Sequence, residues 1–156
     1  MSQTLTVLMT VYNGGHYLRD AIDSILQQTY RDFHFLIVDD ASTDNSREIV
    51  DSYHDERIEL LCLGENVGQT AALNIGLRHA SRIWIARMDA DDYSALTRFE
   101  EQMRVLSEDD SISVLGTHAW TFREDPEVID GEYITPLDNA AIKRQLLRGS
   151  PLIHSS

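Results

Sequence analysis

The sequence has 156 residues, 42% of them hydrophobic, and a formal net charge of −13 at pH 7. This length and apolar content suit one domain with a buried core, which excludes a disordered chain. The acidic balance and the scattered arginines argue against nucleic-acid binding, which needs a basic stripe. Cys62 is the only cysteine, and no apolar run approaches the ~20 residues that cross a bilayer. We expect a cytoplasmic protein whose membrane contact is at most peripheral, at the inner membrane face.

An alternation of strand and helix patterns begins at the N-terminus. The apolar, β-branched run 5–11 suits a strand buried on both faces of a parallel sheet, and apolar residues at helical spacing follow over 16–28. The later strands predicted in this way cover 33–38, 58–63 and 83–88, and the later helices run from the capping residues 42–45 to about 53, over 68–79 and over about 96–106. The order predicts an α/β fold, with a mainly parallel sheet and helices on both faces.

The pattern changes in the last third of the chain. The apolar residues of 112–115 predict a fifth strand. A short antiparallel excursion is expected over 120–134, and a final helix over 139–147. Gly149 to Pro151 then breaks this helix.

Carboxylates follow two of the predicted strands. Ligands of open parallel sheets bind beyond the carboxyl ends of the strands, where Asp39-Asp40 and Asp89-Ala90-Asp91 stand. Asp89 and Asp91 can face one pocket and offer the oxygen ligands that Mg²⁺ or Mn²⁺ prefers, with phosphates of a substrate completing the site. The simpler interpretation is a solvated acidic loop that caps the next helix.

Two further groups of residues fall at the same edge. Asp40 could accept a hydrogen bond from a nucleobase or a ribose, or it could share turn and helix capping with Ser42 and Asp44. Asn66 and Gly68 form a turn in which the glycine lets the backbone approach a ligand, or else a plain strand-to-helix loop. Both alternatives stay open from the residues alone.

These motifs, in this order, resemble family 2 of the glycosyltransferases, which are GT-A (Rossmann-like) enzymes that use nucleotide-diphosphate sugars. The resemblance is carried by Thr-Val-Tyr-Asn at 10–13, Val-Asp-Asp-Ala-Ser-Thr-Asp at 38–44, Asn-Val-Gly at 66–68, Ala-Leu-Asn-x-Gly-Leu at 72–77 and Asp-Ala-Asp-Asp at 89–92. It covers nearly the whole chain.

The resemblance implies a set of site residues. Thr10 and Tyr12 would line the nucleotide pocket, Asp40 would meet the base, and Asp91 would be the more direct ligand of Mg²⁺ or Mn²⁺, with Asp89 beside it. The implied nucleotide-binding residues are Thr10, Val11, Tyr12, Asn13, Asp40, Asn66, Gly68, Asp89 and Ala90.

The resemblance also implies a reaction. A UDP-sugar is the favoured donor, a saccharide or lipid-linked molecule is the acceptor, and the transfer inverts the anomeric centre during synthesis of cell-envelope polysaccharide. The general base of the family falls beyond Ser156, so residues 1–156 are expected to form a single donor-binding domain without the acceptor half. Such a chain is expected to have little activity alone, and its exposed surface could support a homodimer.

Three other functions compete with this interpretation. A sugar-phosphate nucleotidyltransferase would need basic residues in the loop after the first strand, which Asn13 to His16 lacks. A phosphoacceptor receiver domain would place its aspartate pair after the first strand, whereas Asp39-Asp40 follows the second. A non-catalytic module that only binds a nucleotide sugar has the same residues as the enzyme, and the missing base favours it.

Overall fold

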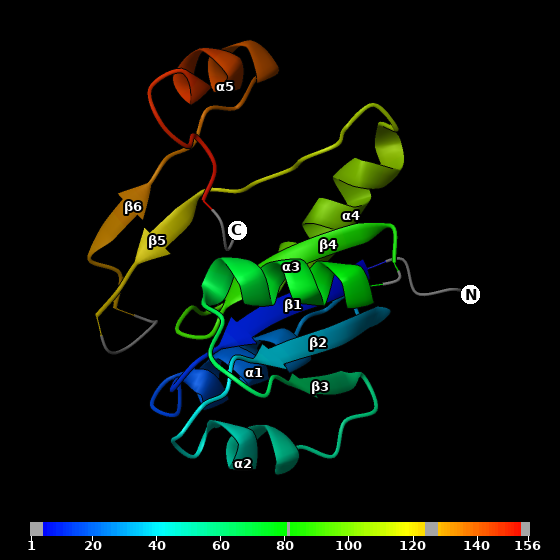
Figure 1. The fold of residues 1–156 in the computed structure, drawn as a ribbon. Coiled ribbons are helices and arrows are strands. Elements are labelled where there is room, and N and C mark those ends of the chain that lie inside the picture. Colours follow the sequence, from blue (N-terminus) through cyan, green and yellow to red (C-terminus); the bar gives the residue numbers. More distant parts are fainter. Residues whose placement is uncertain (1–4, 81, 124–127, 154–156) are drawn as a thin grey trace. The chain divides into compact units, whose positions relative to one another are not determined.

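The computed structural model describes residues 5–80, 82–123 and 128–153. The chain divides into two compact units, Met1–Glu101 and Gln102–Ser156. The first unit contains a four-stranded sheet in the order β3-β2-β1-β4, in which every neighbouring pair is parallel (Figure 1). Its strands are β1 (Leu5–Val11), β2 (Phe33–Asp39), β3 (Ile58–Cys62) and β4 (Trp84–Asp89).

Helices of the first unit cover both faces of this sheet, with α3 in front of it and α1 behind it in Figure 1. They are α1 (Leu18–Leu26), α2 (Ser46–Asp51) and α3 (Gln69–His79). Leu8 of β1 and Val38 of β2 form a buried cluster with Ala72 of α3. Gly76 lets α3 approach these strands, because a Cβ there would lie 2.4 Å from a methyl group of Leu8. The predicted α/β fold with a mainly parallel sheet is confirmed.

The sheet fixes which residues meet at its carboxyl edge. Thr10 pairs with Val38 of β2 on one side and with Asp89 of β4 on the other, and Val11 pairs with Asp39. Because all of these strands run in the same direction, the segments that follow them leave the sheet at the same edge. The acidic pairs after β2 and β4 are therefore separated by β1.

The helix α4 (Arg98–Glu108) begins in the first unit and ends in the second. The second unit contains β5 (Ala119–Thr121) and β6 (Gly131–Tyr133), which pair antiparallel, followed by α5 (Asn139–Leu146). The side chain of Asp138 caps α5 by accepting a 2.8 Å hydrogen bond from the backbone N–H of Ala141. These elements agree with the predicted antiparallel excursion and final helix.

The fifth strand predicted over 112–115 is wrong. This segment pairs with no strand in the part of the chain that the structure describes, and Ile112 instead donates its backbone N–H to Asp109 in a turn. Val114 is 71% exposed, so the apolar side chains are not drawn into a core. A run of four residues interrupted by Ser113 buries too little apolar surface to offset the conformational entropy that is lost when the segment is ordered as a strand.

None of the helices within the described ranges has the length and the apolar character that crossing a membrane requires. The longest of these, α3 and α4, have 11 residues each.

Candidate functional site

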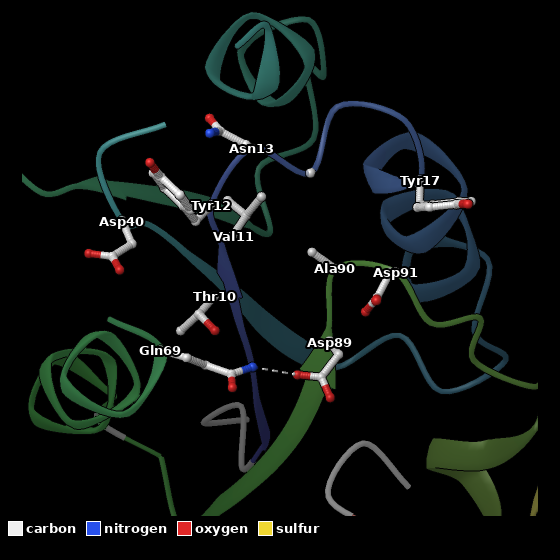
Figure 2. A pocket seen from close by; sticks show the side chains of 11 residues that line it. Thr10, Val11, Tyr12, Asn13, Tyr17, Asp40, Gln69, Asp89, Ala90 and Asp91 are labelled. Carbon is white, nitrogen blue, oxygen red and sulfur yellow. Dashed lines mark hydrogen bonds between the residues drawn. The ribbon is translucent and has the colours of Figure 1, made fainter. Parts of the chain in front are cut away.

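A cavity of about 300 Å³ opens at the carboxyl edge of the sheet in the first unit, at the small end of the range for ligand pockets. Figure 2 shows Asp40 and Tyr12 on one side of it and Asp89 and Asp91 on the other, with Thr10 between them. The predicted site residues that line the cavity are Thr10, Val11, Tyr12, Asn13, Asp40, Asp89, Ala90 and Asp91.

Thr10 places a buried hydroxyl group at the centre of this edge. The residue is only 8% exposed, and its Oγ1 has no hydrogen-bond partner among the described residues. A buried hydroxyl normally has a partner, because leaving one unpaired costs about 1–3 kcal/mol. Thr10 lines the cavity, and its hydroxyl group can both donate and accept a hydrogen bond.

The loop after β1 is joined to the loop after β2 by the side chain of Asn13. Asn13 lies in the left-handed region, with φ of 53°, and its Oδ1 accepts the backbone N–H groups of Thr43 at 2.8 Å and Asp44 at 3.3 Å. In return, the backbone N–H of Asn13 donates to Ser42 Oγ at 3.0 Å. Asn13 therefore shapes the wall of the cavity through contacts within the protein.

Asp44 strengthens the same junction. Its Oδ2 accepts the backbone N–H of Gly15, and its Oδ1 accepts the hydroxyl and the backbone N–H of Ser46. Burial by itself would raise the pKa of Asp44, but these hydrogen bonds favour the charged form and hold the pKa below its usual value. The carboxylate thus stays ionised and keeps the two loops together at neutral pH.

The two aspartates at the end of β2 have different partners. Asp39 is fully buried, accepts a 2.5 Å hydrogen bond from Arg47 Nε, and fixes the turn before α2. Asp40 is 2% exposed, and its two carboxylate oxygens accept the backbone N–H groups of Val67 and Gly68, each at 2.8 Å. Asp40 therefore holds the loop after β3 while it also lines the cavity.

Asn66 and Gly68, which the resemblance implies as nucleotide-binding residues, do not line the cavity. They contact Asp40 instead: Asn66 Nδ2 donates to the carbonyl oxygen of Asp40 at 3.3 Å, and Gly68 donates its N–H to the carboxylate. Gly68 directly precedes α3 and has φ of +85°. Glycine adopts a positive φ without the steric cost that other residues meet. Asn66 and Gly68 therefore hold Asp40 in place through hydrogen bonds, and Asp40 lines the cavity.

Three lining residues were not anticipated from the sequence: Gly14, Tyr17 and Gln69. Gln69 is the first residue of α3, and its Nε2 donates to Asp89 Oδ1 at 3.3 Å, as drawn in Figure 2. Its place directly after Gly68, at the start of a helix that begins at the carboxyl edge, is the signal that could have found it. Gly14 and Tyr17 follow the 10–13 motif along the chain.

The aspartates after β4 differ in how firmly they are held. Asp89 ends the strand, and its Oδ1 also accepts a 2.6 Å hydrogen bond from the Arg87 guanidinium. Asp91 is exposed and makes no hydrogen bond or ion pair with the described residues, although it lines the cavity. Asp91 is thus available to an external cation or to a polar ligand.

A divalent cation fits this arrangement if a ligand shares it. Among the described residues there is no cluster of three or more His, Cys, Asp or Glu side chains that could hold a metal ion. However, Mg²⁺ in phosphate-handling sites is commonly held by one or two carboxylates, with substrate phosphates and water completing the shell. Asp91, with Asp89 beside it, supplies such a partial set.

Comparison with known proteins assigns the family. Residues 6–154 match Glycosyl transferase family 2. The chain belongs to this family. A curated relative from Escherichia coli, UDP-Glc:alpha-D-GlcNAc-diphosphoundecaprenol beta-1,3-glucosyltransferase WfgD, is 35% identical over 102 residues, which are 65% of this chain and 40% of the relative. The family 2 chain spans less than half the length of the curated relatives it matches.

Solved structures confirm the GT-A fold of this family 2 chain. Staphylococcus aureus TarS 1-349 in complex with UDP-GlcNAc is 25% identical, with a TM-score of 0.64 over 67% of this chain and 31% of that one. The mannosyltransferase PcManGT from Pyrobaculum calidifontis, in complex with GDP-Man and Mn²⁺, is 27% identical, with a TM-score of 0.61 over 72% of this chain and 34% of that one.

Proposed function

We propose that this chain forms the donor site of a glycosyltransferase that uses a nucleotide-diphosphate sugar, with a UDP-sugar favoured. The observation that carries the proposal is the cavity at the carboxyl edge, where Thr10, Asp40 and Asp91 come from three strand ends of the sheet. The UDP-GlcNAc bound to TarS and the UDP-Glc in the name of WfgD support a uridine nucleotide. The diphosphoundecaprenol in the latter name supports a lipid-linked acceptor.

The two sides of the cavity suit the two ends of a nucleotide. Tyr12 is 52% exposed and offers an aromatic face to a base, while Asp40 lies close by. Each carboxylate oxygen of Asp40 already accepts one backbone N–H, and each retains a second lone pair that can accept from a base or a ribose. Thr10, in the middle, would contact the ribose or the first phosphate.

Asp89 and Asp91 suit the diphosphate end. We place Asp91 as the direct ligand of Mg²⁺ or Mn²⁺, because Asp89 Oδ1 is already engaged by Arg87 and Gln69. A divalent cation bound there would stabilise the negative charge that develops on the departing nucleotide diphosphate. The GDP-Man and Mn²⁺ bound to PcManGT support this assignment. The proposed transfer is a single inverting displacement, and the general base is not assigned to any residue of this chain.

Calorimetric titration of the purified chain with UDP, GDP and dTDP, with and without Mn²⁺, tests the proposal. We expect UDP to bind most tightly and Mn²⁺ to strengthen its binding. Asp91→Asn should remove most of that gain, roughly 10-fold or more, and change metal-free binding little. Asp51→Asn removes the same charge from an exposed position on α2 outside the cavity and serves as the control. Equal losses with and without metal in Asp91→Asn would reject the ligand role.

A further inference from the structure

The segment that follows Asp91 is anchored by a buried amide from another part of the sequence. Gln28 comes two residues after the end of α1, and its side chain is completely buried. Its Nε2 donates to the carbonyl oxygen of Ala95 at 2.7 Å and to Ser94 Oγ at 3.2 Å, and its Oε1 accepts the backbone N–H of Phe99 at 3.1 Å. One side chain thus satisfies three separate groups of the 94–99 segment.

Ser24 adds a second attachment at the same place. It lies one helical turn before Gln28, and its Oγ accepts the backbone N–H of Ser94 at 3.0 Å while donating to the carbonyl oxygen of Ala21. Ser24 is 2% exposed and Ser94 is 3% exposed, so water does not compete for these bonds. We call the contacts of Ser24 and Gln28 with residues 94–99 the α1 clasp.

The α1 clasp limits where Asp91 can lie. Asp89 is fixed in the sheet by its pairing with Thr10, and Ser94 is fixed by the clasp. Asp91 stands two residues after the first of these points and three before the second. With ~3.8 Å between successive Cα atoms, its Cα stays within about 8 Å of one anchor and about 11 Å of the other. The Asp91 side chain makes no hydrogen bond of its own with the described residues, so these anchors set its place.

We propose that Gln28 is a positioning residue for Asp91, acting through the 94–99 segment on the metal-dependent part of nucleotide binding. The inference rests on the proposed function, in which Asp91 ligates a divalent cation. Gln28 does not line the cavity, so it cannot act on the nucleotide directly. A purely structural role would predict a loss of stability and an equal loss of binding with and without metal. A positioning role predicts that the metal-dependent gain is lost selectively.

The test is the ratio of UDP dissociation constants measured by calorimetry without and with Mn²⁺. Gln28→Leu keeps the bulk of the side chain but leaves the partners in the 94–99 segment unpaired, and we expect the ratio to fall roughly 10-fold, as for residues that orient metal ligands. The affinity for UDP without metal should change by less than about twofold, because Gln28 does not line the cavity and distant sites act nearly independently. Tyr53→Phe is the matched control, because it removes a 2.7 Å hydrogen bond to Asp23 of α1 without touching the clasp.

The outcomes separate this inference from the proposed function. If Mn²⁺ does not strengthen UDP binding to the wild type, the proposed function fails and the positioning role fails with it. If the wild type responds to Mn²⁺ but Gln28→Leu keeps the ratio, or loses both affinities equally, only the positioning role is overturned. If Gln28→Leu does not fold by circular dichroism, Ser24→Ala decides: losing the one bond that Ser24 makes to the 94–99 segment should lower the ratio about threefold. An unchanged ratio would overturn the role.

Discussion

Asp40 and Asp91 lie at the same cavity but differ in what already holds them. Asp40 is buried, and both of its oxygens accept backbone N–H groups of the 67–68 turn. Asp91 is exposed and makes no hydrogen bond with the described residues. Neutralising the two carboxylates should therefore have different consequences. The charge of Asp40 supports the 67–68 turn, whereas the charge of Asp91 is open to a ligand.

We expect Asp40→Asn to lower stability by about 1–3 kcal/mol, because the amide has one acceptor oxygen where the carboxylate has two, and one buried N–H loses its partner. UDP binding should weaken to the same extent with and without Mn²⁺, unlike in Asp91→Asn. Thermal melts and paired calorimetric titrations measure both effects. A melting temperature equal to that of the wild type would show that the Asp40 bonds to the turn contribute nothing.

Most of the lining residues could be predicted because they stand at strand ends, which the apolar runs of the sequence reveal. Asn66 and Gly68 follow β3 at the expected edge, yet the sequence does not show that they contact Asp40 without lining the cavity themselves. Gln28 gave no signal, because apolar periodicity identifies buried hydrocarbon and cannot distinguish a buried amide from an exposed one. Which atoms satisfy a polar group depends on contacts between distant segments.

At the scale of elements, the strands of the parallel sheet were predictable because β1 and β2 are buried on both faces, which demands continuous apolar runs. The segment 112–115 shows the limit of this signal. Four apolar or small residues can form a strand only where a neighbour accepts their backbone hydrogen bonds, and no described strand pairs with them. Strand pairing is a property of the fold and cannot be read from so short a run.

The contact between α3 and the sheet gives a prediction at this scale. A side chain at Gly76 would meet Leu8 and Val38, so Gly76→Val should cost about 1–3 kcal/mol of stability through overpacking. Chemical denaturation measures this, with Asn74→Val on the exposed side of α3 as the control. Combining Gly76→Val with Leu8→Ala should cost less than the sum of the single changes, because the alanine makes room. Strict additivity would show that the two positions do not press on each other.

At the scale of the whole molecule, the chain spans less than half the length of its curated relatives. Acidic residues of the excursion over 120–134, among them Asp125, Glu127 and Asp130, are assigned no catalytic role. Asp125 and Glu127 lie outside the described residues, and Asp130 is held by Thr121 Oγ1 at 2.8 Å and by Arg123 Nε at 3.1 Å.

We expect these 156 residues alone to bind a nucleotide diphosphate but to transfer sugar poorly, because no general base is assigned among the described residues and a positioned base contributes ~10²–10⁴-fold to such a step. Adding the following ~100 residues of a related enzyme, about the size of a small domain, should raise transfer. The assay is release of nucleotide diphosphate from a panel of sugar donors, with and without acceptors. Rapid acceptor-dependent turnover by the chain alone would contradict this expectation and would require a base within it.

The hydrogen bonds of Asn13 and Asp40 have a kinetic consequence. Asn13 ties the loop after β1 to the loop after β2, and Asp40 ties the end of β2 to the loop after β3, all with groups that the protein itself supplies. An incoming nucleotide therefore has little loop motion to arrest and little conformational entropy to remove from these walls. Its association with them should be a single step, with an observed rate that rises in proportion to nucleotide concentration and is not limited by closure of a loop.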